Sequence, residues 1–505
     1  MKALITTTGG MLCALATLPA CDPPLSSSPG SADADQASPH HPDGQLPDRY
    51  TLGEGASEDT DDPGPSPILD EHDLASADYV MLGSEAMELA GSGLAALGDL
   101  DGDSLDDFAV AAPELGSWDG FLGGAYVLRA PPPGTWRLPA ADILIEGTTE
   151  QQWLGTTIAP VWDMDGDGVH ELMLGSPDED GAQYGQGGAY LFTSAQLGPG
   201  DYELFSDEAY AIVRGSLEHM EMGCGGDGRG DLNGDGVGDL LVGSEDDLWI
   251  YMGPISGESY EYDADAALHA GSEYSTYGGG PTHAGDLDGD GLGDLATHYF
   301  IDGEYSVFLH LGPFEGHRSQ DDAHAVLLPE AEDYLKYLSL SGGHDLDGDG
   351  LDDLAIGAPR NDNAGENAGA VHILTSLPEG EFGIGDARAV VYGPDAHAEA
   401  GAVVDASGDV DGDGQLDLLA GAPSFQDARG AAFLVYGPFT GTYSMSDGDV
   451  MMRGMTEGGT AGAAVAHAGD IDGDGLGDIL VGAPLDDTNG EEAGAAFLVL
   501  GASLP

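Results

Sequence analysis

Basic residues are scarce in this chain of 505 residues. Lys and Arg together number 12, against 92 Asp and Glu, which gives a formal net charge of -80. Such a charge repels phosphate backbones and anionic lipid headgroups, so nucleic acid is excluded as a partner. It suits a protein that carries divalent cations.

Cysteine is equally scarce, because Cys13, Cys21 and Cys224 are the only three. A framework of several disulfides is therefore excluded, and stability must come mainly from packing and bound ions. Long apolar runs are also missing from most of the chain. The exception is residues 1–20, "MKALITTTGGMLCALATLPA", where one early Lys precedes an apolar stretch and small residues. This pattern predicts a signal peptide, and the stretch is too short for a membrane span.

The end of that segment, "LPAC" at Leu18 to Cys21, resembles the bacterial lipobox. The resemblance implies lipidation of Cys21 and a lipid-anchored lipoprotein, exported across the inner membrane to the outer membrane or cell surface. The alternative is ordinary cleavage after Ala20, which leaves Cys21 unmodified. Residues 21–76 are rich in Ser, Pro and Asp without an apolar period, so we expect a disordered, acidic tether. Membrane contact would then run only through the N-terminal lipid.

Glycine, by contrast, is abundant at 83 residues, and much of it belongs to one motif that occurs seven times. The copies begin at intervals of roughly 60 residues, which indicates a repeat architecture. They read "DLDGDSLDD", "DMDGDGVHE", "DLNGDGVGD", "DLDGDGLGD", "DLDGDGLDD", "DVDGDGQLD" and "DIDGDGLGD".

Each repeat also carries four short apolar runs bounded by turn residues, a pattern typical of β-strands. Four strands repeated seven times predict an all-β fold, a seven-bladed β-propeller over residues 77–505. The first run, Ala77–Leu82, is of the fourth-strand type, and the last, Ala495–Gly501, is of the third-strand type. We therefore expect the first run to complete the last blade and to close the ring.

The acidic motif places side-chain oxygens at positions 1, 3, 5 and 9, and glycine at positions 4 and 6 allows a tight curl. With the backbone carbonyl of position 7, this donor set suits Ca²⁺ better than Mg²⁺. An EF-hand is excluded because position 12 holds Val481, Ile356, Thr297 or Leu174 instead of Glu. The second copy departs most from the pattern, with Glu171 at position 9. The alternative is a set of solvated acidic turns.

The predicted ligands of up to seven Ca²⁺ ions follow in the order of positions 1, 3, 5, 7 and 9. They are Asp99, Asp101, Asp103, Leu105 and Asp107; Asp163, Asp165, Asp167, Val169 and Glu171; Asp231, Asn233, Asp235, Val237 and Asp239; Asp286, Asp288, Asp290, Leu292 and Asp294; Asp345, Asp347, Asp349, Leu351 and Asp353; Asp409, Asp411, Asp413, Gln415 and Asp417; and Asp470, Asp472, Asp474, Leu476 and Asp478.

With "GAP" at Gly357–Pro359, Gly421–Pro423 and Gly482–Pro484, the repeats resemble the FG-GAP repeats of the integrin α-subunit propeller. The resemblance implies calcium loops on one face, and ligand binding on the opposite face, in the strand 4–1 and strand 2–3 connectors. Ten aromatic residues of those connectors are candidates: Trp118, Trp153, Tyr184, Tyr274, Tyr277, Tyr299, Phe300, Tyr334, Tyr337 and Phe425.

We therefore expect a calcium-stabilised, non-catalytic surface propeller for adhesion to a protein or glycan. No catalytic arrangement of Ser, His and Asp, phosphate loop or zinc spacing is evident, and 12 basic residues make a lyase site hard to assemble. The alternatives are a polysaccharide lyase or hydrolase, and a purely structural envelope scaffold. An Arg-Gly-Asp sequence at Arg229–Asp231 would fit an adhesion ligand, but Asp231 is position 1 of an acidic motif.

Overall fold

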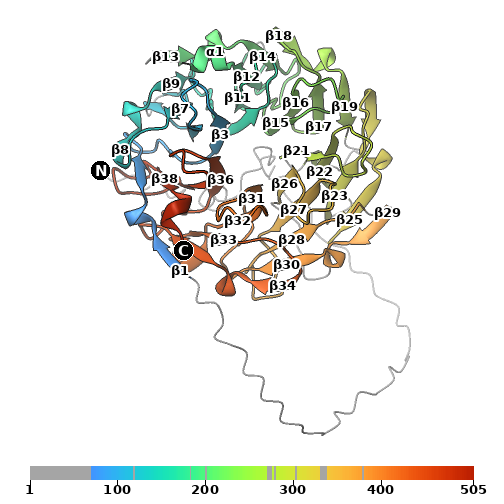
Figure 1. Ribbon diagram of the computed structural model, residues 1–505. Coiled ribbons are helices and arrows are strands. Elements are labelled where there is room, and N and C mark those ends of the chain that lie inside the picture. Colours follow the sequence, from blue (N-terminus) through green and yellow to red (C-terminus); the bar gives the residue numbers. More distant parts are fainter. Residues whose placement is uncertain are drawn as a thin grey trace, which may run out of the picture. The chain divides into compact units, whose positions relative to one another are not determined.

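The computed structural model describes residues 70–505, except 118–119, 182, 199–201, 270–275, 278–279, 302–303, 330–337 and 378–379. The predicted signal peptide and Cys21 lie outside the described residues. The described part is all-β, with two short helices, and its sheets follow one another around a common axis in sequence order (Figure 1). The predicted propeller class is confirmed. None of its helices has the length and hydropathy needed to cross a membrane.

Within the described residues, the strands pair in seven groups of four antiparallel strands, named here blades I to VII. From the axis outward, blades I to III contain β3 (Leu94–Gly98), β4 (Asp107–Ala112), β7 (Gly124–Arg129) and β9 (Ile143–Glu146); β10 (Thr157–Val161), β11 (Glu171–Ser176), β12 (Gly188–Phe192) and β14 (Ala211–Arg214); and β15 (Gly226–Gly230), β16 (Asp239–Gly243), β17 (Asp247–Tyr251) and β19 (Ala266–His269).

Blades IV to VII contain β21 (Thr282–Gly285), β22 (Asp294–Ile301), β23 (Glu304–His310) and β25 (Ala325–Leu328); β26 (Ser339–His344), β27 (Asp353–Ala358), β28 (Ala370–Leu374) and β30 (Ala389–Tyr392); β31 (Val404–Gly408), β32 (Asp417–Ala422), β33 (Ala431–Val435) and β35 (Val450–Arg453); and β36 (Ala464–Gly469), β37 (Asp478–Ala483), β38 (Ala495–Val499) and β2 (Tyr79–Leu82).

A fifth strand, which the sequence pattern did not predict, precedes the fourth strand of every blade and pairs in parallel with the fourth strand of the preceding blade. A 3-10 turn joins it to its own blade, and we call each such strand and turn an arm. Because an arm covers the outer edge of its neighbour, it satisfies backbone groups that an open sheet edge would expose. The arms of blades I to VII are β8 (Gly134–Arg137) with η2 (Leu138–Ala140), β13 (Tyr202–Phe205) with η3 (Ser206–Glu208), β18 (Gly257–Tyr260) with η4 (Glu261–Asp263), β24 (Gly316–Ser319) with η5 (Gln320–Asp322), β29 (Gly380–Gly383) with η6 (Ile384–Asp386), β34 (Gly441–Ser444) with η7 (Met445–Asp447), and β1 (Asp70–Asp73) with η1 (Leu74–Ser76).

The remaining elements lie in connectors. They are β5 (Gly116–Ser117) and β6 (Gly120–Phe121), which form a small hairpin, β20 (Thr276–Tyr277), which pairs antiparallel with the end of β22, α1 (Ser194–Leu197), α2 (Phe425–Ala428) and η8 (Gly501–Ser503).

The two ends of the described chain close the ring as predicted. β2 pairs antiparallel with β38 to complete blade VII. The innermost strands lie against one another in sequence order, and β36 lies against β3. The sequence pattern did not indicate β1, which pairs with β35 of blade VI. The tether expected over residues 21–76 therefore overlaps the fold over Asp70–Ser76.

Neighbouring blades pack through apolar clusters, and two recurring glycines bring their backbones together. A Cβ on Gly482, in the "GAP" element of blade VII, would lie 2.1 Å from the carbonyl oxygen of Gly91, before blade I. Gly421 meets Gly462 in the same way, at 2.0 Å. Gly91 and Gly462 have φ angles of 85° and 83°, in the left-handed region that favours glycine. The glycines of the repeat are thus required by blade-to-blade contact.

Candidate metal centres

Acidic loops I to VII, the nine-residue motifs, connect the first and second strands of blades I to VII. In acidic loop VII, Asp470 Oδ1 accepts hydrogen bonds from the backbone N–H of Gly473 (2.7 Å) and Asp474 (3.0 Å), and its Oδ2 accepts from Gly475 (3.0 Å). Asp472 Oδ1 also accepts from the Asp474 N–H. The first carboxylate therefore bends the loop around itself, as a curled strand-loop-strand cation site requires.

Five other loops repeat this arrangement. The N–H of position 4 donates to the Oδ1 of Asp99, Asp231, Asp286, Asp345 and Asp409, and the N–H of position 6 donates to the Oδ2 of the same residues. At position 5, the Oδ1 of each Asp accepts the N–H of position 7. Asn233 Oδ1 accepts from Asp235 as the Asp at position 3 does elsewhere, so this substitution keeps the curl.

The carboxyl group at position 9 is buried beneath each loop. One of its oxygens accepts the N–H of position 2, as from Leu100 to Asp107 Oδ2 (2.9 Å) and from Ile471 to Asp478 Oδ2 (2.8 Å). In acidic loops III, IV, VI and VII the other oxygen accepts the N–H of Gly253, Gly312, Gly437 or Gly501. In acidic loops I, II and V it is buried without a hydrogen-bond partner, on Asp107, Glu171 and Asp353.

Burial, and after it the repulsion from other carboxylates of the same loop, raises the pKa of these position-9 groups. The pKa reaches about 6 in Asp239, Asp294 and Asp478, about 7 in Asp107 and Asp353, and about 8 in Glu171. The pKa of Asp417 is raised by the same causes. A cation held among these carboxylates would stabilise their ionised forms, which burial and mutual repulsion otherwise disfavour.

The structure brings most of the predicted side-chain ligands within reach of one ion. Carboxylate oxygens of positions 1, 3 and 9 lie within 4.8 Å of one another in acidic loops I, IV, V and VI. Acidic loop II adds position 5, so that Asp163, Asp165, Asp167 and Glu171 form one group. In acidic loops I, IV, V and VI, the Asp at position 5 lies outside these groups. All donors are oxygens and several are buried without partners, so the residues fit a hard cation such as Ca²⁺.

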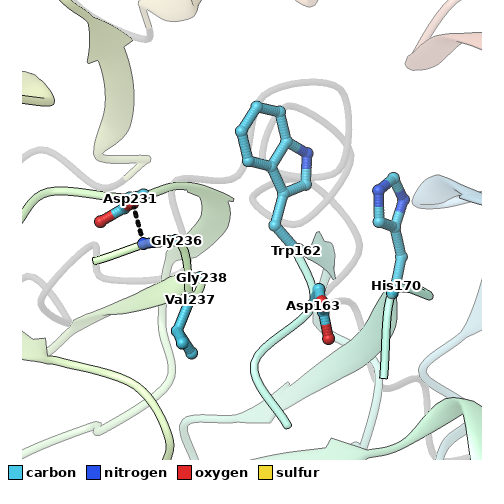
Figure 2. Close-up of a pocket in the computed structure, with 8 residues that line it drawn as sticks. Trp162, Asp163, His170, Asp231, Gly236, Val237 and Gly238 are labelled. Carbon is cyan, nitrogen blue, oxygen red and sulfur yellow. Dashed lines mark hydrogen bonds between the residues drawn. The ribbon is translucent and has the colours of Figure 1, made fainter. Parts of the chain in front are cut away.

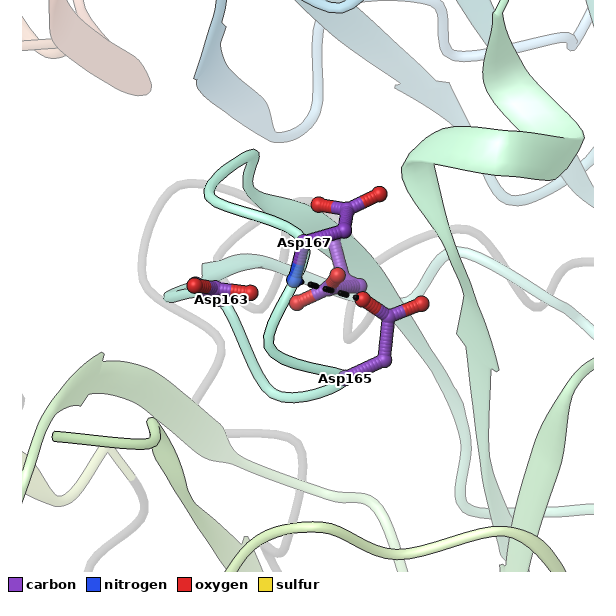
Figure 3. A group of neighbouring side chains, drawn as sticks. Asp163, Asp165 and Asp167 are labelled. Atoms are coloured by element: carbon purple, nitrogen blue, oxygen red, sulfur yellow. Dashed lines mark hydrogen bonds between the residues drawn. The ribbon is translucent and has the colours of Figure 1, made fainter. Parts of the chain in front are cut away.

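Figure 3 shows the carboxylates of acidic loop II, which are held differently from those of the other acidic loops. Asp163 Oδ1 is buried without a hydrogen-bond partner, whereas the same atom accepts two N–H groups in acidic loop VII. Asp167 Oδ2 accepts from the hydroxyl of Ser194, at 2.6 Å, on α1. Asp165 still accepts the Asp167 N–H, so half of the usual curl remains.

Position 8, which the sequence pattern did not single out, links successive loops around the ring. Asp106 Oδ2 in acidic loop I accepts the N–H of Asp470 in acidic loop VII (2.7 Å), and Asp352 Oδ2 accepts that of Asp286 (2.7 Å). His170 occupies the same position in acidic loop II and lies over Gly98. The signal was an acidic residue following position 7 in two of the seven copies.

Between acidic loops II and III lies a pocket of about 390 Å³ (Figure 2). Trp162, Asp163 and His170 line it from one side, and Asp231 and Val237 from the other. Trp162 is 44% exposed, and its ring stacks on that of His170 with centroids 6.5 Å apart. Most other copies have Gly immediately before the loop, so a large exposed aromatic here is specific to blade II.

The Arg-Gly-Asp sequence is not presented as a protruding ligand loop. The guanidinium of Arg229 pairs with Asp227 through Nε (3.0 Å) and Nη2 (3.2 Å). Burial alone would raise the pKa of Asp227, but Arg229 and the neighbouring His283 lower it to about 2. Asp231 accepts three N–H groups of its own loop. Both charged groups of the sequence thus have structural partners.

Of the ten candidate connector aromatics, Tyr184 is 62% exposed and lies edge-on to His219. Tyr299 and Phe425 are buried, at 0% and 5% exposure, and Phe425 packs on Phe433, so these two belong to the core. Trp153 is half-buried. The other six, Trp118, Tyr274, Tyr277, Phe300, Tyr334 and Tyr337, or their side chains, lie outside the described residues.

Comparison with known proteins identifies FG-GAP repeats at residues 337–374, 400–435 and 461–499, which span the first three strands of blades V, VI and VII. The chain is 25% identical to integrin alpha-PS3 of Drosophila melanogaster over 50% of its length and 21% of that protein. It is 28% identical to integrin alpha-PS2 of the same organism over 42% and 15% of the two chains. It is 35% identical to human integrin alpha-IIb over 18% and 9%.

The chain therefore contains FG-GAP repeats similar to those of integrin α subunits, and it matches about a fifth or less of those relatives' lengths. Among solved structures, the crystal structure of BBS1N in complex with ARL6DN, soaked with lead, has a TM-score of 0.46 and 10% identity. That match covers 84% of this chain and 94% of the other.

Proposed function

We propose that the chain is a calcium-loaded recognition propeller and that its seven acidic loops are structural Ca²⁺ sites. The side chains of positions 1, 3, 5 and 9, with the carbonyl of position 7, would hold each ion. What supports this is the buried oxygen of Asp107, Asp353 and Glu171, which has no partner in the protein. Extracellular modules bind Ca²⁺ at about 10⁻⁴–10⁻³ M, so such sites fill outside a cell.

The proposal that the propeller binds a ligand rests on its exposed apolar side chains. Among the described residues, the large apolar side chains that face solvent all fall between residues 162 and 262, on blades II and III and their arms. They are Trp162, Tyr184, Phe205, Tyr210, Leu217 and Tyr262. Trp162 and Tyr262 lie at the acidic-loop ends of the strands and Tyr184 lies at the opposite ends, so both faces of blades II and III offer exposed aromatics that would gain from being covered.

The ligand class we favour is a surface protein or a glycan, because Tyr and Trp present both an apolar ring and a polar group. Tyr260 and Tyr262 stack with centroids 5.3 Å apart beside Glu258 and Asp263, which also suits a basic protein surface. We infer a non-enzymatic role, with display at the cell surface through a lipid on Cys21. The rivals are a polysaccharide lyase or hydrolase and a purely structural scaffold.

The test is binding to a glycan array and to immobilised envelope proteins, using the calcium-saturated protein. Trp162→Ala and Tyr262→Ala test the face of the acidic loops, and Tyr184→Ala tests the opposite face. The variants of the face that binds should weaken binding of a hit by at least about tenfold, as expected for central aromatic contacts. Trp136→Ala, a half-buried aromatic on the arm of blade I, is the matched control. Turnover of a glycan hit would favour the enzyme, and equal binding by all four variants would contradict the assignment to blades II and III.

A further inference from the structure

A second group of metal-ligating side chains lies on the outer edge of blade III, away from the acidic loops. Asp247 begins β17, and His269 ends the neighbouring strand β19, directly opposite it. His317 lies on β24, the arm of blade IV that pairs with β19. Three residues from two blades thus meet at one junction.

The contacts within this group are short and directional. His269 Nδ1 lies 2.8 Å from Asp247 Oδ1, and His269 Nε2 lies 2.6 Å from His317 Nδ1. The two imidazole planes differ by 8°, with centroids 4.9 Å apart. Stacked rings stay about 3.5 Å apart, so a nitrogen–nitrogen distance of 2.6 Å means that the rings meet edge to edge. The ring nitrogens therefore point at each other.

Asp247 decides which nitrogen of His269 carries the proton. Because a carboxylate only accepts, His269 Nδ1 must donate to it, which leaves the lone pair of Nε2 directed at His317. A carboxylate that holds the remote N–H of an imidazole is the usual support for a histidine that binds a metal, since it fixes the ring and increases its basicity.

We propose that His269 and His317 form a site for a borderline divalent cation such as Zn²⁺, oriented by Asp247, that bridges blades III and IV. The ion would take the place of the proton now shared between the two nitrogens, and that proton would move to His317 Nε2, which keeps both imidazoles neutral. Water or a partner's group would complete the coordination of the ion. Neutral imidazoles favour Zn²⁺, Cu²⁺ or Ni²⁺, whereas the oxygen-lined acidic loops favour Ca²⁺. The nitrogen ligands of this site and the oxygen ligands of the acidic loops therefore favour different metal ions.

The geometry needs little change to admit the ion. Two zinc–nitrogen bonds of about 2.0–2.1 Å at a tetrahedral angle place the nitrogens about 3.3 Å apart, so the present gap must widen by less than about 1 Å. His317 is exposed, and the His269 side chain is 35% exposed, so both can adjust. Trp249 cannot follow them, because it is 6% exposed and donates to Ser244.

Trp249 also provides a reporter. Its ring lies edge-on to both imidazoles, with centroids 5.7 Å from His269 and 6.3 Å from His317. A paramagnetic ion bound between the histidines should quench its fluorescence, and Trp249→Phe should remove that part of the signal.

The experiment titrates Zn²⁺ into the full chain, kept saturated with Ca²⁺ so that the acidic loops do not compete. Calorimetry should show one tight Zn²⁺ per chain, and Ni²⁺ or Cu²⁺ should quench Trp249. His269→Gln and His317→Gln should weaken Zn²⁺ by at least about tenfold, and Asp247→Asn by about 10- to 100-fold. His397→Gln is the matched control, because His397 is a similarly exposed histidine beside a single carboxylate, Glu366.

The results separate the proposal from its rivals. Equal Zn²⁺ binding by His317→Gln and His397→Gln would overturn it, as would the absence of Zn²⁺ binding by the wild-type chain. If the histidine variants fail to fold, quenching by Ni²⁺ in the wild type but not in Asp247→Asn still tests the site. Because Ca²⁺ is held constant, failure here leaves the calcium proposal untouched.

Discussion

Acidic loops VII and II share five of their nine residues but hold their carboxylates differently. In acidic loop VII, backbone N–H groups engage both oxygens of Asp470 and both oxygens of Asp478. In acidic loop II, one oxygen of Asp163 and one of Glu171 are buried without partners. The first loop is organised by its own backbone, whereas the second depends more on an ion.

Acidic loop II shares its unpaired position-9 oxygen with acidic loops I and V, but two of its side chains are specific to it. Glu171 is one methylene longer than the Asp found at position 9 elsewhere, so its carboxyl group sits differently beneath the loop. At position 8, His170 replaces the Asp that ties acidic loops I and V to their neighbours. A preorganised loop loses less free energy on binding its ion, so acidic loop VII should bind Ca²⁺ more tightly than acidic loop II.

Removal of all Ca²⁺ should have the largest effect, because it tests both loops at once. At a Ca²⁺ concentration of about ten times Kd, each site contributes about 1.4 kcal/mol, so seven sites contribute about 10 kcal/mol. Thermal unfolding with excess chelator should then show Tm lower by about 10 °C for a domain of this size. An unchanged Tm would contradict the assignment of the acidic loops as calcium sites.

The metal-free protein should next show an unusual dependence on pH. The folded-state pKa values of the position-9 groups are raised to about 6 to 8, so the folded state holds these protons more tightly than the unfolded state. This stability is fully present below about pH 4 and is lost as pH rises to about 8. Thermal scans in chelator should give a lower Tm at about pH 8 than at about pH 5.

Two features sharpen this pH prediction. Glu171→Gln should reduce the loss of folding stability near pH 8, because Glu171 has the highest of these pKa values. With saturating Ca²⁺ the trend should reverse, since the ion competes with protons for the same oxygens. If the Tm of the metal-free protein rises with pH, burial does not raise the pKa of these carboxyl groups.

Single-site variants compare the two loops directly. Asp478→Asn and Glu171→Gln should each remove one bound Ca²⁺, measured by calorimetric stoichiometry. In the presence of Ca²⁺ we expect Asp478→Asn to cost about 1–2 kcal/mol and Glu171→Gln less than about 1 kcal/mol, because the tighter site contributes more. Asp395→Asn, on an exposed connector, is the charge-matched control. Equal costs would mean that backbone organisation does not set affinity.

The smallest expected effect comes from giving acidic loop II the linking residue of acidic loops I and V. His170→Asp would place a carboxylate where it can accept the N–H of Asp99, as Asp106 accepts that of Asp470. One such hydrogen bond should stabilise the calcium-loaded protein by about 0.5–1.5 kcal/mol. Denaturant titration measures the gain, and a loss of stability would show that His170 is needed where it is, against Trp162.

The sequence was informative wherever a feature depends on residues close together in the chain. The acidic motif fixes its own curl, so its seven copies and the strands beside them follow from local residue order alone. The arms do not, because Gly134–Arg137 or Gly441–Ser444 become strands only by pairing with a neighbouring blade. A Gly nine residues before the fourth strand in five of the seven blades was the available signal.

The sequence also could not predict which connector side chains are exposed to solvent. Tyr184 and Tyr299 both occupy connectors in the sequence pattern, yet one is exposed and the other is fully buried. The difference arises because β22 and β23 extend beyond the usual strand length, so Tyr299 joins a sheet and packs on Phe308. Position 8 was similarly hidden, since its partner lies in the preceding blade.

The arm of blade VII is equivalent to the other six, although it stands at the opposite end of the described chain from the blade it completes. Asp78 binds Leu500 and Ser503, so the two ends of the ring already lie together. The ring of blades therefore does not depend on which arm comes first in the sequence. Joining these ends and opening the chain before any other arm, such as between Arg129 and Gly134, would give a circular permutant with the same blades, acidic loops and closing contacts.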